Sequence, residues 1–283
     1  MTNILKNKID FALIMSVKNA NPNGDPLNGN RPRVNFDGLG EISDVAIKRK
    51  IRNRLLDLGE KVLMQSHDYK NDNHENIKAR VESVDSIKKE TTKKGTKDAD
   101  KVLELACKEW IDVRTFGQVL AFGKEDDDSK GLSVPIRGPL SIQPAFSIEP
   151  VDLTHTKIVK SMNSTQVGGV QKDRMGDKHR IDHGIYVTYG TINPQLAQKT
   201  GFTKDDALKI KEAMRTLFEN DATSARPSGS MEVLKLIWWE QDKGNNKEIL
   251  SSARVHRSLT VNNDGTCQLD GSIGISAEVI DGM

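Results

Sequence analysis

Residues 9 to 34 constrain this chain most, because an apolar run passes there directly into a loop of asparagine, proline and glycine. The run from 9 to 17 is rich in β-forming residues and short for a helix, which predicts a buried central strand. In the loop, Asn and Gly tolerate positive φ while Pro fixes φ, so the composition is that of a rigid turn. With its closing Arg31-Pro32-Arg33, the loop could hold an anionic or hydrogen-bonding ligand, or it could be a solvated Ω-loop without one.

Composition narrows the class of protein. The 283 residues, 36% of them hydrophobic, suffice for one large domain or two ordinary ones. With 42 basic against 40 acidic residues, a polyanion would have to bind a local patch rather than the net charge. Cys107 and Cys267 are far apart and not at metal-ligand spacing, which indicates a reducing compartment and no structural zinc. Without a long apolar run or a signal-like N-terminus, the sequence predicts a soluble cytoplasmic protein with no membrane contact.

A basic amphipathic helix is expected after the loop, beginning at Ser43 or Asp44. Apolar residues at steps of three and four between Ile47 and Val62 would form its buried stripe. Five of the seven positions from 48 to 54 are Lys or Arg, and no Glu stands at i,i+4 spacing to neutralise them. This pattern favours an anion-binding face over a merely solvated one.

The middle of the chain contains a change of composition. Residues 66 to 101 are mostly charged and polar with the single aromatic Tyr69, which predicts a peripheral insertion, helical or partly mobile, that buries little. His67 and His74 lie there without a second ligand pair, so we interpret them as surface residues. A helix from about 102 to 112 follows, and then a segment in which Arg114 and Gln118 share one side. The acidic run at 125 to 131 lacks the alternating spacing of a calcium loop.

A projecting flap is predicted between two strands. Residues 132 to 151 contain four prolines and are interpreted as an edge or bulged strand. The basic segment 153 to 181 has Gly168-Gly169 at its centre and precedes an alternating strand from 184 to 192, which indicates a β-hairpin. Its Met162 and Met175, beside cations, could be inserted between stacked bases or could pack under the flap.

The last third completes an α+β pattern. Thr203 opens a capping-box variant and a helix, a loop with Arg226 and Ser228 follows, and a strand is expected from 231 to 240. A last strand pair near 267 to 275 would fold back onto the sheet. The main elements are then strand, helix, strand, flap, strand, helix, strand, which is the ferredoxin-like βαββαβ order of RNA-recognition modules.

Five separate motifs occur in an order that resembles a known family. They are NANPNGDPLNGNRPRV, SDVAIKRKIRNRL, DVRTFGQVLAF, PIRGPLSIQPAFS and RMGDKHRIDHGIYVTYG. The chain resembles the Cas-seven backbone subunit of type I CRISPR Cascade complexes, in the RAMP superfamily, and in particular the Csd-two type of type I-C. The resemblance covers nearly all of the chain except 66 to 101.

The resemblance implies a single hand-shaped domain over 1–283. It would have a modified RNA-recognition-motif palm, a helical insertion at 66–101 and a β-hairpin thumb at 153–181. It also implies a non-catalytic subunit, without cofactor or metal, that polymerises head to tail along the guide crRNA in a ribonucleoprotein filament. The copies would help present the guide to target DNA beside the Cas-five and Cas-eight type subunits and the small subunit, while base pairing reads the sequence.

Motifs and resemblance together predict a set of RNA-binding residues. Loop and helix residues would hold phosphates and riboses, and four further residues would extend the groove. Thumb residues would cover a displaced nucleotide, and the loop before the strand expected at 231 to 240 could meet a phosphate. The residues, in that order, are Asn19, Asn21, Asn23, Arg31, Arg33, Lys48, Arg49, Lys50, Arg52 and Arg54; Arg114, Gln118, Ser141 and Gln143; Lys160, Met162, Gln166, Lys172, Arg174 and Met175; and Arg226 and Ser228.

Two other functions remain open from the sequence. Asp25 lies where related subunits of type III complexes carry an acidic residue that cuts target RNA, so a metal-dependent RNase is one alternative. However, the loop has no second carboxylate, and Asp25 is better explained as the cap of a turn. Asp182, between Arg180 and His183, is a weaker acid-base candidate. A stand-alone RNA-binding protein that forms no filament is the other alternative.

Overall fold

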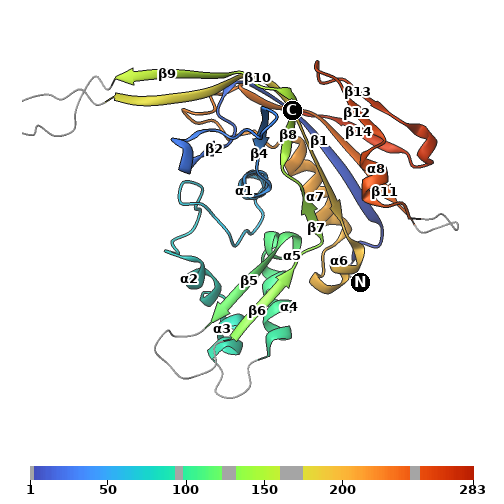
Figure 1. The fold of residues 1–283 in the computed structure, drawn as a ribbon. Coiled ribbons are helices and arrows are strands. Elements are labelled where there is room, and N and C mark those ends of the chain that lie inside the picture. Colours follow the sequence, from blue (N-terminus) through green and yellow to red (C-terminus); the bar gives the residue numbers. More distant parts are fainter. Residues whose placement is uncertain (1–2, 93–97, 123–131, 160–174, 243–248) are drawn as a thin grey trace, which may run out of the picture.

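A large antiparallel sheet organises the molecule. The computed structural model describes residues 3–92, 98–122, 132–159, 175–242 and 249–283 (Figure 1). In these residues eight strands form one sheet in the order β14-β11-β1-β10-β8-β4, with β7 and β9 also paired to β10. The strands are β1 Lys8–Ala20, β4 Leu39–Ile42, β7 Leu140–Ile142, β8 Ala145–Pro150, β9 Leu153–Val159, β10 Met175–Ile192, β11 Met231–Gln241 and β14 Ala277–Asp281.

Strand β1 lies at the centre, as the apolar run predicts. It pairs antiparallel with β10 on one side and β11 on the other. Residues 9 to 15 are all buried, because both faces of the sheet are covered at this point. A strand buried on both faces reads as a continuous apolar run rather than as an alternation.

Two helices cover one face of the sheet. They are α1 Asp44–Asp57, capped by Ser43, and α7 Lys204–Arg215, which opens with the predicted capping box between Thr203 and Asp206. Their apolar stripes pack with Phe11 and Leu13 of β1 in the main core. Helix α1 ends earlier than the sequence predicts, since Leu58 is its exposed C-cap and the buried Val62 lies beyond it.

The C-terminal segment covers the opposite face. Helix α8 Ser252–His256 and the hairpin of β12 Leu259–Val261 with β13 Cys267–Leu269 lie there, while β14 extends the sheet beside β11. Ala12 and Ile14 of β1 pack in this layer with Val255 and Leu259. RNA-recognition modules stack bases on an open sheet face. Since this face is covered, a nucleic-acid site has to be sought at the ends of the strands.

A second core lies beside the insertion. Helices α2 Ile77–Glu82 and α3 Asp85–Thr92 of the insertion pack there with α4 Ala99–Glu109, α5 Ile111–Phe116 and the hairpin of β5 Gly117–Phe122 with β6 Leu132–Arg137. Val81 and Ile87 are fully buried in it with Trp110 and Val113. Among the described residues of 66 to 101 only Arg80, Val81, Ile87 and Thr91 are buried, so the prediction that this segment buries little is confirmed, and most of this core comes from α4, α5 and the hairpin.

The segment predicted as one edge strand is divided into β6, β7 and β8. Pro139 and Pro144 fall in the two breaks, where the absence of a backbone N–H does no harm.

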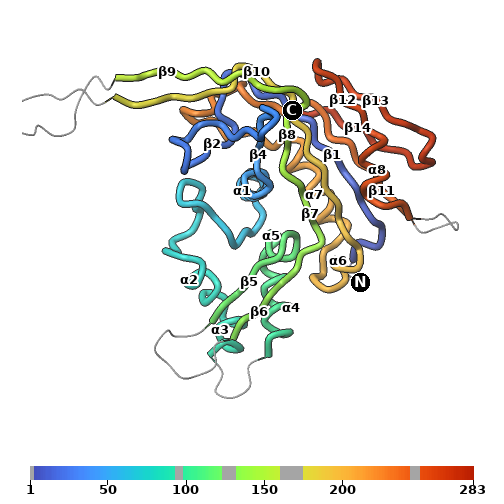
Figure 2. The backbone as a smooth tube through the Cα atoms, in the orientation of Figure 1, coloured from blue at the N-terminus to red at the C-terminus, as the bar shows by residue number. Residues whose placement is uncertain are grey.

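A two-stranded ribbon occupies the place of the predicted thumb. Strand β9 pairs with residues 175 to 181 of β10, and the two project from the body of the molecule (Figure 2). The predicted RNA-binding residues Lys160, Met162, Gln166, Lys172 and Arg174 lie outside the described residues. Met175, at the outer end of the described part of β10, is exposed.

The remaining short elements are β2 Gly24–Asp25, η1 Pro26–Asn28, β3 Arg31–Pro32, α6 Pro194–Thr200 and η3 Gly271–Ile273. Among the helices that the structure describes, none has the length and apolar character needed to cross a membrane.

Candidate nucleic-acid interface

Several predicted segments meet at one pocket, which we call the junction pocket. It has a volume of about 400 Å³ and is lined by the asparagine-rich loop, α1, residues 66 to 69 and the loop that follows α7. Four of the predicted residues line it, namely Asn23, Arg49, Lys50 and Arg226. The fold thus brings together groups that are up to about two hundred positions apart in the sequence.

Asparagines make the loop rigid. The Asn21 amide donates to the Asn30 carbonyl at 2.7 Å, and Asn23 Oδ1 accepts the Ser43 N–H at 2.9 Å, which ties the loop to the start of α1. Asn19 and Asn30 adopt φ values of 55° and 58°, a region that asparagine tolerates better than most residues. Asn21 and Asn23 therefore hold the loop in place, while the Asn19 side chain is exposed.

Asp25 caps a turn, as the sequence predicts. Its Oδ1 accepts the Leu27 N–H at 3.1 Å and lies 3.5 Å from the Arg33 guanidinium. No group of three or more His, Cys, Asp or Glu side chains in the described ranges is arranged to hold a metal ion.

Many cations of α1 have protein partners. Lys48 pairs with Asp44 at 2.9 Å, and Arg54 donates to Thr216 at 2.7 Å. Arg52 pairs at 3.0 Å with Asp112, whose side chain is fully buried. In the described part of the chain, the charged groups of Lys48, Arg52 and Arg54 therefore already have polar partners.

Lys50 and Arg226 share a single carboxylate. Lys50 Nζ and Arg226 Nε both donate to Asp221 Oδ2, the latter at 3.0 Å. Burial lowers the pKa of Lys50 to about 8, although Asp221 partly offsets this. The junction pocket is lined by three cationic side chains, Arg49, Lys50 and Arg226, and by two carboxylates, Asp221 and Asp68, which leaves a surplus of one positive charge while Lys50 is protonated.

Arg49 is the third cation of the junction pocket. Its guanidinium donates to the carbonyl of Met64, a neutral acceptor. Burial, followed by the charge of Arg52, lowers the pKa of Arg49, whereas Asp112 and Asp68 raise it. An anion in the junction pocket would relieve the repulsion between Arg49 and Arg52.

Polar atoms around the junction pocket have unused bonding capacity. Asn53 Oδ1 and Ser66 Oγ, from residues that line the pocket, are buried and make no hydrogen bond within the described part of the chain. The same holds for Asn21 Oδ1, Arg33 Nε and Ser230 Oγ on segments that border it. Buried polar groups in proteins are nearly always paired, so such a group of unpaired atoms indicates a place for a ligand or for water.

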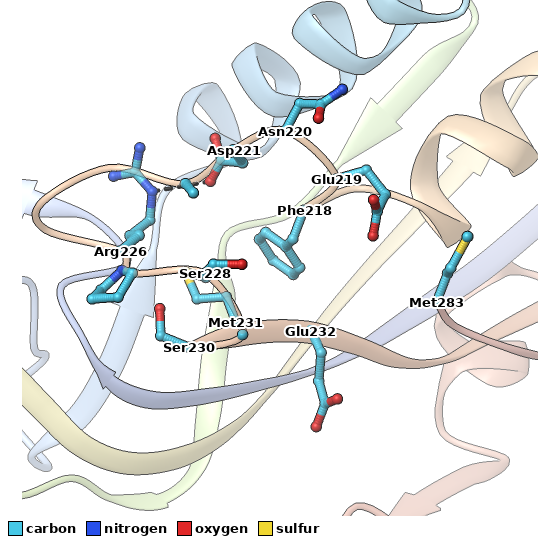
Figure 3. A pocket seen from close by; sticks show the side chains of 13 residues that line it. Phe218, Glu219, Asn220, Asp221, Arg226, Ser228, Ser230, Met231, Glu232 and Met283 are labelled. Carbon is cyan, nitrogen blue, oxygen red and sulfur yellow. Dashed lines mark hydrogen bonds and ion pairs between the residues drawn. The ribbon is translucent and has the colours of Figure 1, made fainter.

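A second pocket adjoins the first through the loop after α7. It has a volume of about 470 Å³, and Figure 3 shows Arg226, Ser228, Ser230 and Phe218 around it. Arg226 lines both pockets. The predicted residue Ser228 thus lies next to the junction pocket rather than in it.

The four residues predicted to extend the groove lie elsewhere. Arg114 donates to both carboxylate oxygens of Asp206, at 3.0 and 2.7 Å, in a separate pocket between α4 and α6. Gln118 lies on β5. Leu140 and Ile142 point into the core on the α1 side, so the alternation of β7 places Ser141, followed by Gln143, toward the opposite face. The structure does not bring these four to the junction pocket.

Sequence reasoning missed Tyr69, Asn220 and Asp221. The Tyr69 hydroxyl donates to the Asn220 carbonyl, and this contact joins the start of the insertion to the loop after α7. No local pattern marks these residues, because their role depends on a contact across about 150 positions of the chain.

Comparison with known proteins identifies the family. The model of the family CRISPR-associated protein Cas7 matches residues 7–272. A CRISPR-associated protein Cas7 from Haloferax volcanii is 26% identical over 258 residues, which cover 84% of this chain and 72% of that protein.

One solved structure shows a similar fold. A chain of a CRISPR RNA-guided surveillance complex in a pre-nicking state has a TM-score of 0.51 and 14% identity, and the match covers 88% of this chain and 81% of that one. A chain of another such complex has a TM-score of 0.46 and 14% identity, with 92% and 77% covered. Because the family match extends over nearly the whole sequence, the chain belongs to the CRISPR-associated protein Cas7 family.

Proposed function

We propose that this protein is a non-catalytic backbone subunit that binds crRNA in a CRISPR surveillance complex of the type I-C Cascade kind. Copies would associate head to tail along the guide in the cytoplasm and support recognition of target DNA together with the other Cascade subunits. Membership of the Cas7 family supports this proposal, as does the fold shared with a chain of an RNA-guided surveillance complex.

The strand order supports a modified RNA-recognition-motif palm. In the order β11-β1-β10-β8, the first and third strands of the βαββαβ pattern lie at the centre of the sheet. Helices α1 and α7 follow these two strands and pack on one face, as that pattern requires. We assign the thumb to residues 153–181 and the insertion to residues 66–101 of a single hand-shaped domain.

The junction pocket carries the proposal for the site. Its unpaired polar atoms and its surplus positive charge fit a ribose-phosphate backbone, which offers anionic oxygens and hydroxyl groups. The cations best placed to bind phosphate are Arg49 and two residues at the end of the loop, Arg31 and Arg33. Arg31 is exposed and makes no hydrogen bond or ion pair with the described residues. Lys50 and Arg226 would contribute through Asp221.

The test compares two double variants in RNA binding. Arg33→Gln with Arg49→Gln removes two proposed phosphate contacts, whereas Arg254→Gln with Arg257→Gln removes two exposed cations at α8, on the opposite face of the sheet. If about five phosphates are bound per subunit, the log–log dependence of affinity on salt should have a slope near −3.5 for wild type. The slope should fall in magnitude by about 1.4 in the first variant and stay unchanged in the second.

Assembly of subunits on RNA is examined separately, by electron microscopy of the protein co-expressed with the repeat RNA. We expect wild type and the α8 variant to form helical strings of subunits. We expect the Arg33 and Arg49 variant to form none. A wild-type slope near zero, or strings that form equally well in both variants, would contradict the proposed site. Regularly spaced, metal-dependent cuts in complementary RNA that disappear in Asp25→Ala would instead support the RNase alternative.

A further inference from the structure

Two histidines face each other across the thumb ribbon. His155 of β9 is the direct cross-strand partner of His179 in β10, and Lys157 is the partner of Asp177. The imidazole rings are stacked, with centroids 4.6 Å apart and an interplanar angle of 12°. Because alternate residues of a strand share a face, these four side chains lie together on one face of the ribbon. We call this surface the histidine face.

The histidine face carries more cationic than anionic groups. Asp177 Oδ1 lies 2.8 Å from His155 Nε2 and 2.8 Å from Lys157 Nζ. The charged groups that act on His179 are His155, Lys157, Asp177 and Arg31 of β3, a strand that packs against β10. One carboxylate thus stands against Lys157, Arg31 and two imidazoles. On the other face of the ribbon, Arg180 is already paired with Asp182.

The surroundings of His179 disfavour its protonated form. Partial burial lowers the pKa of His179, and the positive charges of His155 and Arg31 lower it further. Hydrogen bonds from Lys157 and His155 lower the pKa of Asp177 to about 2, so this carboxylate stays ionised at neutral pH. A bound phosphate would oppose the repulsion between the imidazoles and so favour their protonation.

One loop connects the histidine face with the junction pocket. Arg31, which acts on His179, ends the same loop whose Asn23 lines the junction pocket. Farther out on the histidine face, Met175 and Val159 are cross-strand partners, and both are exposed. An apolar pair beside cations suits a base and its phosphate. One RNA strand could therefore contact both surfaces.

We propose that the histidine face is a second RNA contact, which binds a backbone phosphate with uptake of a proton by the His155–His179 pair. The proton comes from solvent and adds to a ring nitrogen, and no covalent bond to the RNA forms. This inference rests on the proposed function, because it requires that guide RNA reach the thumb.

The experiment measures proton uptake during RNA binding by isothermal titration calorimetry. The full chain is titrated with oligouridine in buffers of different ionisation enthalpy, between about pH 6 and pH 7, where an unperturbed imidazole titrates. Lys50, with a pKa of about 8, remains largely protonated in this range. We expect wild type to take up as much as about one proton per bound segment and to bind up to about tenfold more tightly per unit fall in pH.

Three variants make the result specific. His155→Gln with His179→Gln should abolish the uptake and flatten the pH dependence, whereas the matched control His74→Gln, in the insertion, should behave as wild type. His155→Lys with His179→Gln supplies a fixed charge. This variant should bind oligouridine at about pH 7 with the affinity that wild type reaches near pH 6, and it should take up no proton.

The outcomes separate the two proposals. The role of the histidine face is overturned if wild type binds RNA in a salt-dependent way without proton uptake. It is also overturned if proton uptake persists in the double glutamine variant. In both cases the proposed function stands. The absence of salt-dependent RNA binding by wild type at any pH overturns the proposed function itself. All side chains changed are at least partly exposed, so folding of the variants is checked by circular dichroism.

Discussion

Removing the Arg52 guanidinium should weaken the packing of α5 against α1 rather than remove a phosphate contact. Arg52 on α1 pairs with Asp112 on α5, and it also stacks over the Phe116 ring at 4.7 Å from the centroid. Asp112 in turn accepts the N–H groups of Leu63 and Met64 at 2.7 and 3.1 Å. This carboxylate therefore joins three segments of the chain.

The expected loss of stability follows from the burial of the Arg52–Asp112 pair. The side chains of Arg52 and Asp112 are 12% and 0% exposed, and breaking a buried pair by removing one partner costs about 3–5 kcal/mol. We expect about 3 kcal/mol for Arg52→Gln, because Asp112 keeps its two N–H donors. We expect about 5 kcal/mol for Asp112→Ala, which leaves the Arg52 charge and both N–H groups without their partner.

Thermal unfolding measures these costs. At about 2 °C per kcal/mol for a chain of this size, Tm should fall by about 6 °C in Arg52→Gln and about 10 °C in Asp112→Ala. The surface control Arg254→Gln should change stability by less than about 0.5 kcal/mol. The salt slope of RNA binding by Arg52→Gln, measured well below its Tm, should equal that of wild type. An unchanged Tm combined with a slope reduced by about 0.7 would show that Arg52 binds phosphate in solution and would refute the structural role.

Two further predictions concern stability. Burial lowers the pKa of Lys50 in the folded protein to about 8, below its usual value of 10.5. The free energy of unfolding should therefore rise by about 1.4 kcal/mol per pH unit between these values, and this gain is lost as pH falls through 8. Urea unfolding from about pH 8 to pH 10 should show this rise in wild type relative to Lys50→Met; identical profiles would contradict it. A Cβ on Gly40 would lie 2.0 Å from the buried Tyr186 hydroxyl, so Gly40→Ala should destabilise by about 1–3 kcal/mol. Gly271→Ala, where no atom lies within 4 Å, is the matched control, and equal Tm values would refute the expected clash.

Periodicity in the sequence predicts the elements that form the core. The continuous apolar run gave the central strand β1, and steps of three and four gave the buried faces of α1 and α7. The capping box at Thr203 and the strand β11 are also confirmed. These features succeed because they depend on neighbours within one or two turns or on alternation along one strand.

The electrostatics of α1 could not be predicted in the same way. A local count finds five cations in seven positions without a nearby Glu. The carboxylates that neutralise two of them are Asp112, which is 60 positions from Arg52, and Asp221, which is 171 positions from Lys50. Such partners are set by tertiary contacts, so a basic helix face in a sequence indicates charge without showing how much of it is free.

The position of the proposed site follows from the register of the sheet. In the antiparallel pairing, Val17 lies opposite Met231, and Ala20 lies opposite Ile181. The end of β1, the loop before β11 and the base of the thumb ribbon therefore meet at one edge. With both faces of the sheet covered, this edge is where backbone amides, loop side chains and cations from separate segments can reach one ligand. A shift of β1 by one residue would exchange the side chains that pack into the two buried layers, Phe11 and Leu13 on one face and Ala12 and Ile14 on the other. It would also displace the asparagine-rich loop relative to the loop after α7, so packing of the sheet and assembly of the junction pocket depend on the same pairing.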